Sequence, residues 1–201
     1  MGAILILSGP SGSGKSTLCS AISQAFENVY FSISSTTRKP REGEVDGRES
    51  HFLTQEEFLK DVEENKFLEW AQVHTNYYGT SLRPVEKALS EGKIVVFDVD
   101  VQGHHSIKKH YDSLATSVFI TTPTKKVLAE RLKNRKTDEQ DIIELRLMHA
   151  YNEMQHIDEF DYLIINDDID EAKRSILSIV QSLKCKQTNA KTQKILKEWI
   201  E

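Results

Sequence analysis

Apolar residues occur in four short, almost continuous runs along the chain. These runs cover residues 3–8, 93–100, 115–121 and 162–166, and stretches with helical spacing or turn-forming residues separate them. Continuous apolar runs are typical of the inner strands of a parallel sheet, because helices cover both faces of such a sheet. The pattern therefore predicts an α/β fold with a parallel sheet flanked by helices.

Two polar segments interrupt this alternation. Residues 34–80 combine short polar strands with a helix that we expect to begin at Thr54, because Thr54 and Glu57 have the spacing of a capping box. Residues 124–157 are arginine-rich and helical. We interpret both segments as insertions into a single domain spanning residues 1–201, with a core made of residues 1–33, 81–123 and 158–201.

The last segment of the chain also has helical spacing. Ile195, Leu196, Trp199 and Ile200 fall on one stripe of the predicted helix. A stripe of this kind is more often a packing face than a binding site. We therefore interpret it as a packing face and assign it no function.

Composition limits what the protein can bind. With 201 residues, 38% hydrophobic and 28% charged, the chain is typical of a globular protein that folds in water. A formal net charge of −5 argues against a general nucleic-acid binder. Cys19 and Cys185 form no CxxC pair, so neither a disulfide framework nor a thiolate metal site is indicated. The first apolar run is too short for a signal peptide or a membrane span, and we expect a cytoplasmic protein without membrane contact.

A glycine-rich loop follows the first apolar run. It reads GPSGSGKST and comprises Gly9, Pro10, Ser11, Gly12, Ser13, Gly14, Lys15, Ser16 and Thr17. Apolar residues at helical spacing come next, so the context is strand, loop and helix. Such a loop turns backbone N–H groups towards phosphate oxygens, while the lysine reaches the β- and γ-phosphates and the serine hydroxyl binds Mg²⁺. The loop predicts binding of a nucleoside triphosphate.

Residues 34–44, SSTTRKPREGE, place hydroxyl, cationic and carboxylate side chains around Pro40. Taken alone, the stretch has no apolar periodicity and fits a solvated surface loop. Phosphoryl transfer between two nucleotides, however, brings an anionic acceptor beside an anionic donor, so fixed cations must offset their repulsion. Arg38 and Arg41 flank the proline, and a guanidinium group can hold a monophosphate by paired hydrogen bonds. They are candidates for binding the acceptor phosphate.

Six motifs occur in order along the chain: GPSGSGKST, SSTTRKPREGE, FLEWAQV, NYYGT, DVDVQG and NDD. Together they resemble guanylate kinase, a nucleoside monophosphate kinase of the P-loop NTPase superfamily, from about residue 3 to residue 183. The ordered motifs are far more specific than the phosphate loop alone. The resemblance implies an enzyme of purine nucleotide metabolism that transfers the γ-phosphoryl of MgATP to GMP, and to dGMP. Residues 34–80 would then form the GMP-binding insertion and residues 124–157 the lid.

The resemblance also implies the residues of the GMP site, which are Ser34, Arg38, Arg41, Glu44, Glu69, Tyr78, Thr80, Asp98 and Asp100. Guanine presents two donors beside one acceptor. Glu69 would accept from the donors, and Ser34 and Thr80 would donate to O6. Tyr78 would bind the acceptor phosphate. Judged as single residues, Glu69 also fits a half-exposed strand, Tyr78 a packing aromatic, Glu44 a loop salt bridge and Asp98 a turn cap.

The predicted lid supplies further cations. By resemblance Arg131, Arg135 and Arg146 lie over the transferring phosphoryl and stabilise its charge, and with Lys15 and Arg38 they form the predicted catalytic residues. Each of the three also fits an arginine on a solvated helix face. Asn166 in the motif NDD is the predicted contact to the adenine of ATP.

Two positions depart from the family pattern. Ser50 occupies the place of a second tyrosine that commonly contacts the acceptor phosphate. Either a water molecule, His51 or Arg48 takes over that contact, or the affinity for the acceptor is lower. Residues flanking Arg135 are not the usual glycines, which predicts a stiffer or differently shaped lid hinge. The oligomeric state is open between monomer and homodimer.

Two other functions compete with this interpretation. One is a kinase of another nucleoside monophosphate on the same core. The other is a non-enzymatic binding module, because guanylate kinase-like domains also serve as interaction scaffolds. Lys15, Ser16 and Arg38 are intact here, which favours an enzyme.

Overall fold

Five parallel strands form the central sheet of the protein. The computed structural model describes residues 2–73, 75–134, 140–187 and 189–200. The strands lie in the order β2-β7-β1-β8-β9 and all neighbouring pairs are parallel. Their bounds are β1 Ala3–Ser8, β2 Val29–Phe31, β7 Ile94–Asp98, β8 Ala115–Thr121 and β9 Tyr162–Ile165. All four predicted strands are confirmed, and so is their parallel arrangement.

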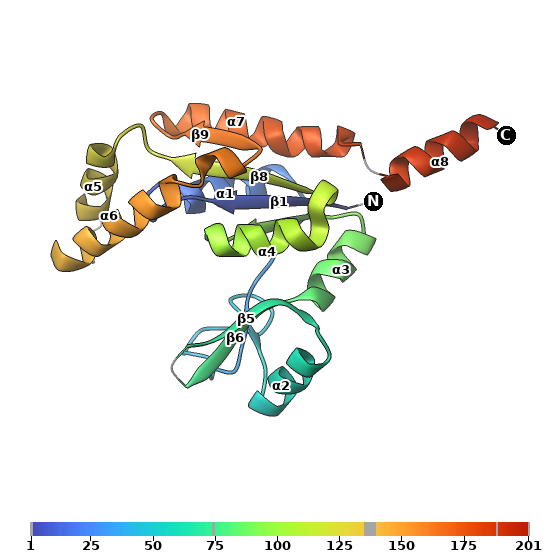
Figure 1. Cartoon of the computed structure of the whole chain (residues 1–201), viewed down its shortest axis with the longest axis horizontal. Helices are drawn as coiled ribbons and strands as arrows, with labels where there is room; N and C mark the ends of the chain where they lie inside the picture. The colour runs from blue at the N-terminus through green and yellow to red at the C-terminus, as the bar shows by residue number, and fades with distance from the viewer. Residues whose placement is uncertain (1, 74, 135–139, 188, 201) are drawn as a thin grey trace.

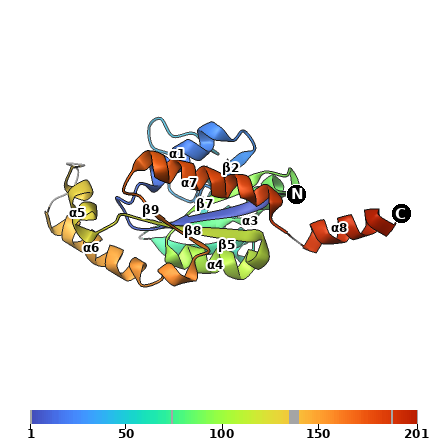
Figure 2. The same cartoon turned by 90° about the horizontal axis from the view of Figure 1, so that it is seen from above.

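Helices cover both faces of this sheet (Figures 1 and 2). Leu5 and Leu7 of β1 pack with α1 (Lys15–Ala25) and α7 (Ile169–Ser182) on one face. Ile4 and Ile6 belong to the apolar cluster on the other face, beside α3 (Leu82–Ser90) and α4 (Val101–Tyr111). Because successive side chains of a strand point to opposite faces, a strand buried on both sides is apolar at most positions. All four of these β1 side chains are fully buried.

A smaller sheet lies below the main one in Figure 1. Its strands are β3 (Ser35–Thr36), β4 (His51–Phe52), β5 (Phe67–Val73) and β6 (Asn76–Ser81), in the order β4-β3-β6-β5. The helix α2 (Gln55–Glu63) packs beside them through Phe58, which stacks on Phe67. The predicted capping box is confirmed: Thr54 Oγ1 accepts from the Glu57 N–H, and the Glu57 carboxylate accepts from the Thr54 N–H.

Two helices, α5 (Lys125–Asn134) and α6 (Gln140–Met154), form the predicted arginine-rich segment. They pack on each other through a separate apolar cluster that includes Leu128, Leu132, Ile143 and Ala150. The short helical turn η2 (Ile157–Glu159) then leads from α6 into β9, and further turns are η1 (Asp112–Leu114) and η3 (Leu183–Cys185). This segment therefore has its own small core beside the main sheet.

The C-terminal helix α8 (Asn189–Ile200) extends away from the body of the protein (Figures 1 and 2). Its stripe is open to solvent, with Ile195 and Leu196 about half exposed and Trp199 and Ile200 exposed by 85% and 86%. Within the described residues nothing covers this stripe, and its interpretation as a packing face stays a prediction. Periodicity identifies an apolar face but does not identify what covers it. Within the described ranges, no helix is both long and apolar enough to cross a membrane.

Candidate active site

The phosphate loop connects β1 to α1 and depends on glycine at two positions. Gly9 has φ 135°, and a Cβ there would lie 2.0 Å from the Ile120 carbonyl oxygen. Gly14 has φ 103° and is the N-cap of α1, and a Cβ there would lie 2.2 Å from Asn166 Nδ2. Both positions need a residue without a side chain. The loop therefore turns tightly and directs the N-terminus of α1 at the space above it.

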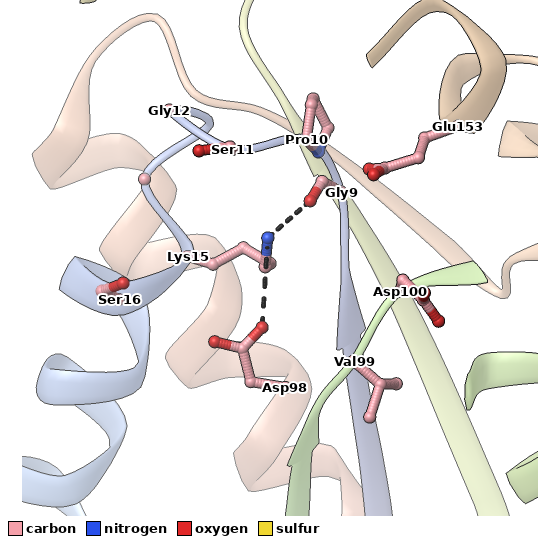
Figure 3. A pocket seen from close by; sticks show the side chains of 11 residues that line it. Gly9, Pro10, Ser11, Gly12, Lys15, Ser16, Asp98, Val99, Asp100 and Glu153 are labelled. Carbon is pink, nitrogen blue, oxygen red and sulfur yellow. Dashed lines mark hydrogen bonds and ion pairs between the residues drawn. The ribbon is translucent and has the colours of Figure 1, made fainter. Parts of the chain in front are cut away.

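A cavity of about 390 Å³ lies over this loop. Its lining comes from the loop, from the end of β7 and from α6, and consists of Gly9, Pro10, Ser11, Gly12, Gly14, Lys15, Ser16, Asp98, Val99, Asp100 and Glu153. Figure 3 shows Lys15 between the loop and Asp98. Its ammonium group donates to the Gly9 carbonyl oxygen at 2.5 Å and lies 3.9 Å from Asp98 Oδ1. The cation is thus held at the mouth of the loop.

Asp98 ends β7 directly beside β1, because Leu7 and Asp98 are paired in the sheet. Burial raises the pKa of its carboxyl group, although Lys15 acts in the opposite direction. Its side chain is still 42% exposed. The Asp98 carboxylate and the hydroxyl of the exposed Ser16 therefore both line the cavity, where phosphates and a divalent cation would bind.

Glu153 is a site residue that sequence reasoning missed. It comes from α6, and Figure 3 shows its side chain directed towards Gly9 and Pro10. Burial raises the pKa of its carboxyl group, and Oε2 is buried without a hydrogen-bond partner among the described residues. Its only sequence signal is its place three residues after the buried Ala150, which marks a helix face but no chemistry.

Asn166 lies under the phosphate loop instead of at its surface. Its side chain is buried, the residue being 1% exposed, and Nδ2 donates to the Ser13 carbonyl oxygen at 2.8 Å. Its own backbone carbonyl accepts from Arg131 Nη2 at 2.8 Å. The residue thus connects β9, the loop and the helix α5. In this arrangement its amide contacts the loop backbone, and the adenine contact remains a prediction.

The arginines of the predicted lid are placed in two different ways. Arg131 lies on α5 and reaches the end of β9, as described above, whereas Arg146 on α6 donates from Nη1 to Ser11 Oγ at 3.0 Å. Arg146 therefore extends from α6 to the rim of the phosphate loop. Arg135 lies outside the described residues.

On the smaller sheet, Arg38 is paired with Glu44 through two hydrogen bonds, 2.9 Å and 3.0 Å long. Glu44 also accepts from the Arg41 backbone N–H at 2.6 Å. These hydrogen bonds lower the pKa of the Glu44 carboxyl group to about 2, and the pair raises the pKa of Arg38. Tyr78 lies close enough to Arg38 to contribute to that increase. Glu44 thus forms the loop salt bridge that its residue type allows, and in doing so it orients Arg38.

Three polar residues of the predicted guanine site form one row across the small sheet. Glu69 on β5 is paired with Thr80 on β6, and Thr80 Oγ1 donates to Glu69 Oε1 at 2.9 Å. On the other side, β3 pairs Ser35 with Gly79 in an antiparallel register. Continuing that register by one residue sets Ser34 opposite Thr80. The fold therefore brings the Glu69 carboxylate and the Thr80 hydroxyl into contact, and the chain at Ser34 continues the same register beside Thr80.

The contacts of Asp100 and of the residues near Ser50 relate less directly to their predicted roles. Asp100 lines the cavity but also caps α4, where Oδ1 accepts from the Gly103 N–H at 2.8 Å. Ser50 forms an isolated bridge with Asp46. Arg48, one candidate to replace the missing tyrosine, instead contacts Glu49 and the backbone of the same loop. The ring of His51 has a buried Nε2 without a hydrogen-bond partner among the described residues.

A parallel sheet with a lysine-containing phosphate loop between its first strand and first helix defines a P-loop nucleotide-binding protein. The helix α6 also brings Arg146 to the rim of this loop, as expected for a phosphoryl-transferring member of this class. The family model for guanylate kinase matches residues 1–183. The chain belongs to the guanylate kinase family, whose members are nucleoside monophosphate kinases that phosphorylate GMP with ATP.

Similar proteins of known identity support this membership. The chain is 59% identical to the guanylate kinase of Helicobacter hepaticus over 98% of both chains. It is 54% identical to that of Wolinella succinogenes, over 98% of this chain and 92% of the relative. Among solved structures, the crystal structure of guanylate kinase from Anaplasma phagocytophilum matches with a TM-score of 0.66 at 30% identity, covering 95% of this chain and 92% of that chain.

Proposed function

We propose that this chain transfers the γ-phosphoryl of MgATP to GMP, and to dGMP as a second acceptor, giving ADP and the nucleoside diphosphate. The observation that carries this proposal is the row of Ser34, Thr80 and Glu69 on the smaller sheet. A carboxylate accepts from the N1–H and N2 amino groups of guanine, and a hydroxyl donates to O6. Adenine presents the opposite pattern on that edge, so AMP would leave these groups without partners.

The donor nucleotide binds over the phosphate loop. Backbone N–H groups of the phosphate loop hold its phosphates, and Lys15 supplies a cation to the β- and γ-phosphates. Ser16, exposed at the N-terminus of α1, fits a hydroxyl ligand to Mg²⁺, with Asp98 supporting the metal site from the end of β7. When bound, Mg²⁺ neutralises charge on the phosphate oxygens. Asn166 acts by holding the loop from below, through Ser13.

The acceptor phosphate is held by cations and a phenol. Arg38, Arg41 and Tyr78 bind it, and Glu44 keeps the Arg38 guanidinium oriented before GMP arrives. This preorganisation lowers the entropy lost on binding. Asp100, as the cap of α4, fixes the end of the helix that borders the cavity and leaves a carboxylate near the base.

Catalysis follows from position and charge. Arg131 and Arg146 approach the loop from the lid, and together with Arg135 they stabilise the charge that spreads over the transferring phosphoryl. Residues 34–80 and residues 124–157 close over the core as separate units, which excludes water from the reaction. We also propose that the enzyme works in the cytoplasm, where ATP and GMP are available.

The test is an assay of the purified protein with MgATP and one of four acceptors, GMP, AMP, CMP or UMP, with ADP formation as the measurement. We expect turnover with GMP, and with dGMP in a fifth reaction, and almost none with the other three. Replacing Mg²⁺ by excess EDTA should abolish turnover. Equal turnover of AMP and GMP would contradict the guanine-reading site, while no turnover of any acceptor would favour a binding module.

A further inference from the structure

A second group of polar side chains lies outside the nucleotide cavity, where α4 meets the turn η2. His104 and His105 are consecutive residues of α4, and Glu159 ends η2, 54 residues after His105. One ligand atom from each of these three side chains lies within 4.8 Å of the other two. The fold therefore gathers two imidazoles and a carboxylate at one point.

His104 is the unusual member of this group. Its residue is 2% exposed, and neither ring nitrogen has a hydrogen-bond partner within the described ranges. The ring stacks on Phe160 with 4.0 Å between centroids, which fixes its orientation. Buried polar groups are normally satisfied, and one that is not calls for an explanation. A neutral imidazole carries one lone-pair nitrogen, so this fixed, buried ring has a nitrogen available to a metal ion.

Glu159 is oriented from two sides. One carboxylate oxygen contacts His105 Nε2, and the other contacts His156 Nδ1 at 2.7 Å. A carboxylate that binds a metal through one oxygen and a histidine through the other is a common arrangement around metal sites. The nearby Lys108 is paired with Asp161 at 2.7 Å.

We propose that His104, His105 and Glu159 bind a divalent transition-metal ion of the Zn²⁺ type, with His156 holding Glu159 from outside. Imidazole and carboxylate ligands suit Zn²⁺, whereas Mg²⁺ takes oxygen ligands almost exclusively. Zn²⁺ needs its ligand atoms about 2 Å from the ion. The exposed side chains of His105 and Glu159 can rotate to bring their ligand atoms to this distance from the ion, while the His104 ring stays stacked on Phe160. Binding would replace the His105–Glu159 contact and release any proton shared there.

The bound ion would join two functional parts of the enzyme. The helix α4 begins beside Asp100 at the nucleotide cavity, and η2 follows the lid helix α6. A second hollow already lies between these helices, lined by Asp100, Val101, Gln102, His149, Asn152, Glu153 and His156. A metal at this place fastens the base of the lid to the core. The site is separate from the Mg²⁺ that accompanies ATP.

The experiment measures Zn²⁺ binding by calorimetry on protein without a polyhistidine tag and without nucleotide. We expect one saturable site in the wild type. His105→Ala and Glu159→Gln should each weaken it by roughly tenfold or more, and both residues are exposed, so these variants should fold. His110→Ala, on the same helix and also exposed, is the matched control and should keep the wild-type affinity. Zn²⁺ should raise the melting temperature of the wild type and His110→Ala more than that of the other two variants.

Co²⁺ provides a second readout, because the intensity of its visible absorption distinguishes four-coordinate from six-coordinate sites. We expect a four-coordinate spectrum in the wild type that is lost in His105→Ala. Wild-type Zn²⁺ affinity in His105→Ala and Glu159→Gln, or the absence of a saturable site in the wild type, would overturn the proposal. Displacement of Zn²⁺ by an equal concentration of Mg²⁺ would overturn the choice of metal. None of these outcomes depends on turnover of GMP.

Discussion

Replacing Asn166 by alanine tests how the core supports the phosphate loop. The substitution removes the hydrogen bond from Nδ2 to the Ser13 carbonyl oxygen, 2.8 Å long, at a place where both residues are almost fully buried. It removes no hydrogen bond from the side-chain oxygen, because Asn166 Oδ1 has no partner among the described residues. The Arg131 hydrogen bond goes to the backbone carbonyl of Asn166 and survives the change.

The cost follows from leaving the Ser13 carbonyl buried without its donor. Such a loss costs about 1–3 kcal/mol of unfolding free energy. For a chain of 201 residues this corresponds to a fall of the melting temperature by roughly 2–12 °C. Asn152→Ala, an exposed asparagine on α6, is the matched control and should unfold within about 0.5 kcal/mol of the wild type. Urea unfolding followed by circular dichroism measures both variants.

The same variant separates loop support from a direct contact to adenine. If Asn166 acts through the loop, the KM values for ATP and for GTP as donor should rise by the same factor, because both place the same phosphates there. If it contacts the base, only the preference between the two donors should change. An Asn166→Ala protein that unfolds like the control and shifts only the ATP-to-GTP ratio would refute loop support.

Three further outcomes can be checked independently. Gly9→Ala should destabilise the protein by at least about 3 kcal/mol, because its Cβ would lie 2.0 Å from the Ile120 carbonyl oxygen at a φ of 135°; a wild-type melting temperature would contradict this. Burial raises the pKa of Cys19 to about 12, so at pH 8 a thiol reagent should label only the exposed Cys185 quickly in native protein, and two rapidly labelled thiols would be inconsistent with the structure. The pKa of Glu44 falls from 4.5 to about 2, so the stability it contributes is present above pH 4.5 and lost as pH falls through 2; the difference in stability between wild type and Glu44→Gln should therefore shrink below pH 4.5.

Much of the fold can be predicted from local patterns. Continuous apolar runs specify buried parallel strands, and the capping box at Thr54 specifies where α2 begins. The phosphate loop is a local motif whose residues are adjacent in sequence, so its position could be predicted in full. What covers the stripe on α8 could not be predicted, because amphipathic spacing carries no information about its partner.

The site is predictable only where its residues belong to a motif. Glu153 reaches the cavity because α6 packs against the core, and no local signal marks it. Asn166 belongs to the motif NDD, but the motif does not show that the side chain lies below the loop. That position depends on how β9 joins the sheet. The row of Ser34, Thr80 and Glu69 depends on the register of three strands. The positions of these residues are set by how helices and strands pack and pair in the folded protein, which local sequence does not show.

The measurement that tests guanine recognition most directly compares Glu69→Gln with the wild type. The amide keeps the shape of the side chain but turns one acceptor into a donor facing the donors of guanine. We expect kcat/KM for GMP to fall roughly 10–100-fold, while the Kd for a non-hydrolysable ATP analogue stays within about twofold. Glu56→Gln, an exposed glutamate of α2, should change neither value. A Glu69→Gln enzyme with wild-type kcat/KM for GMP would contradict the assignment of the guanine site.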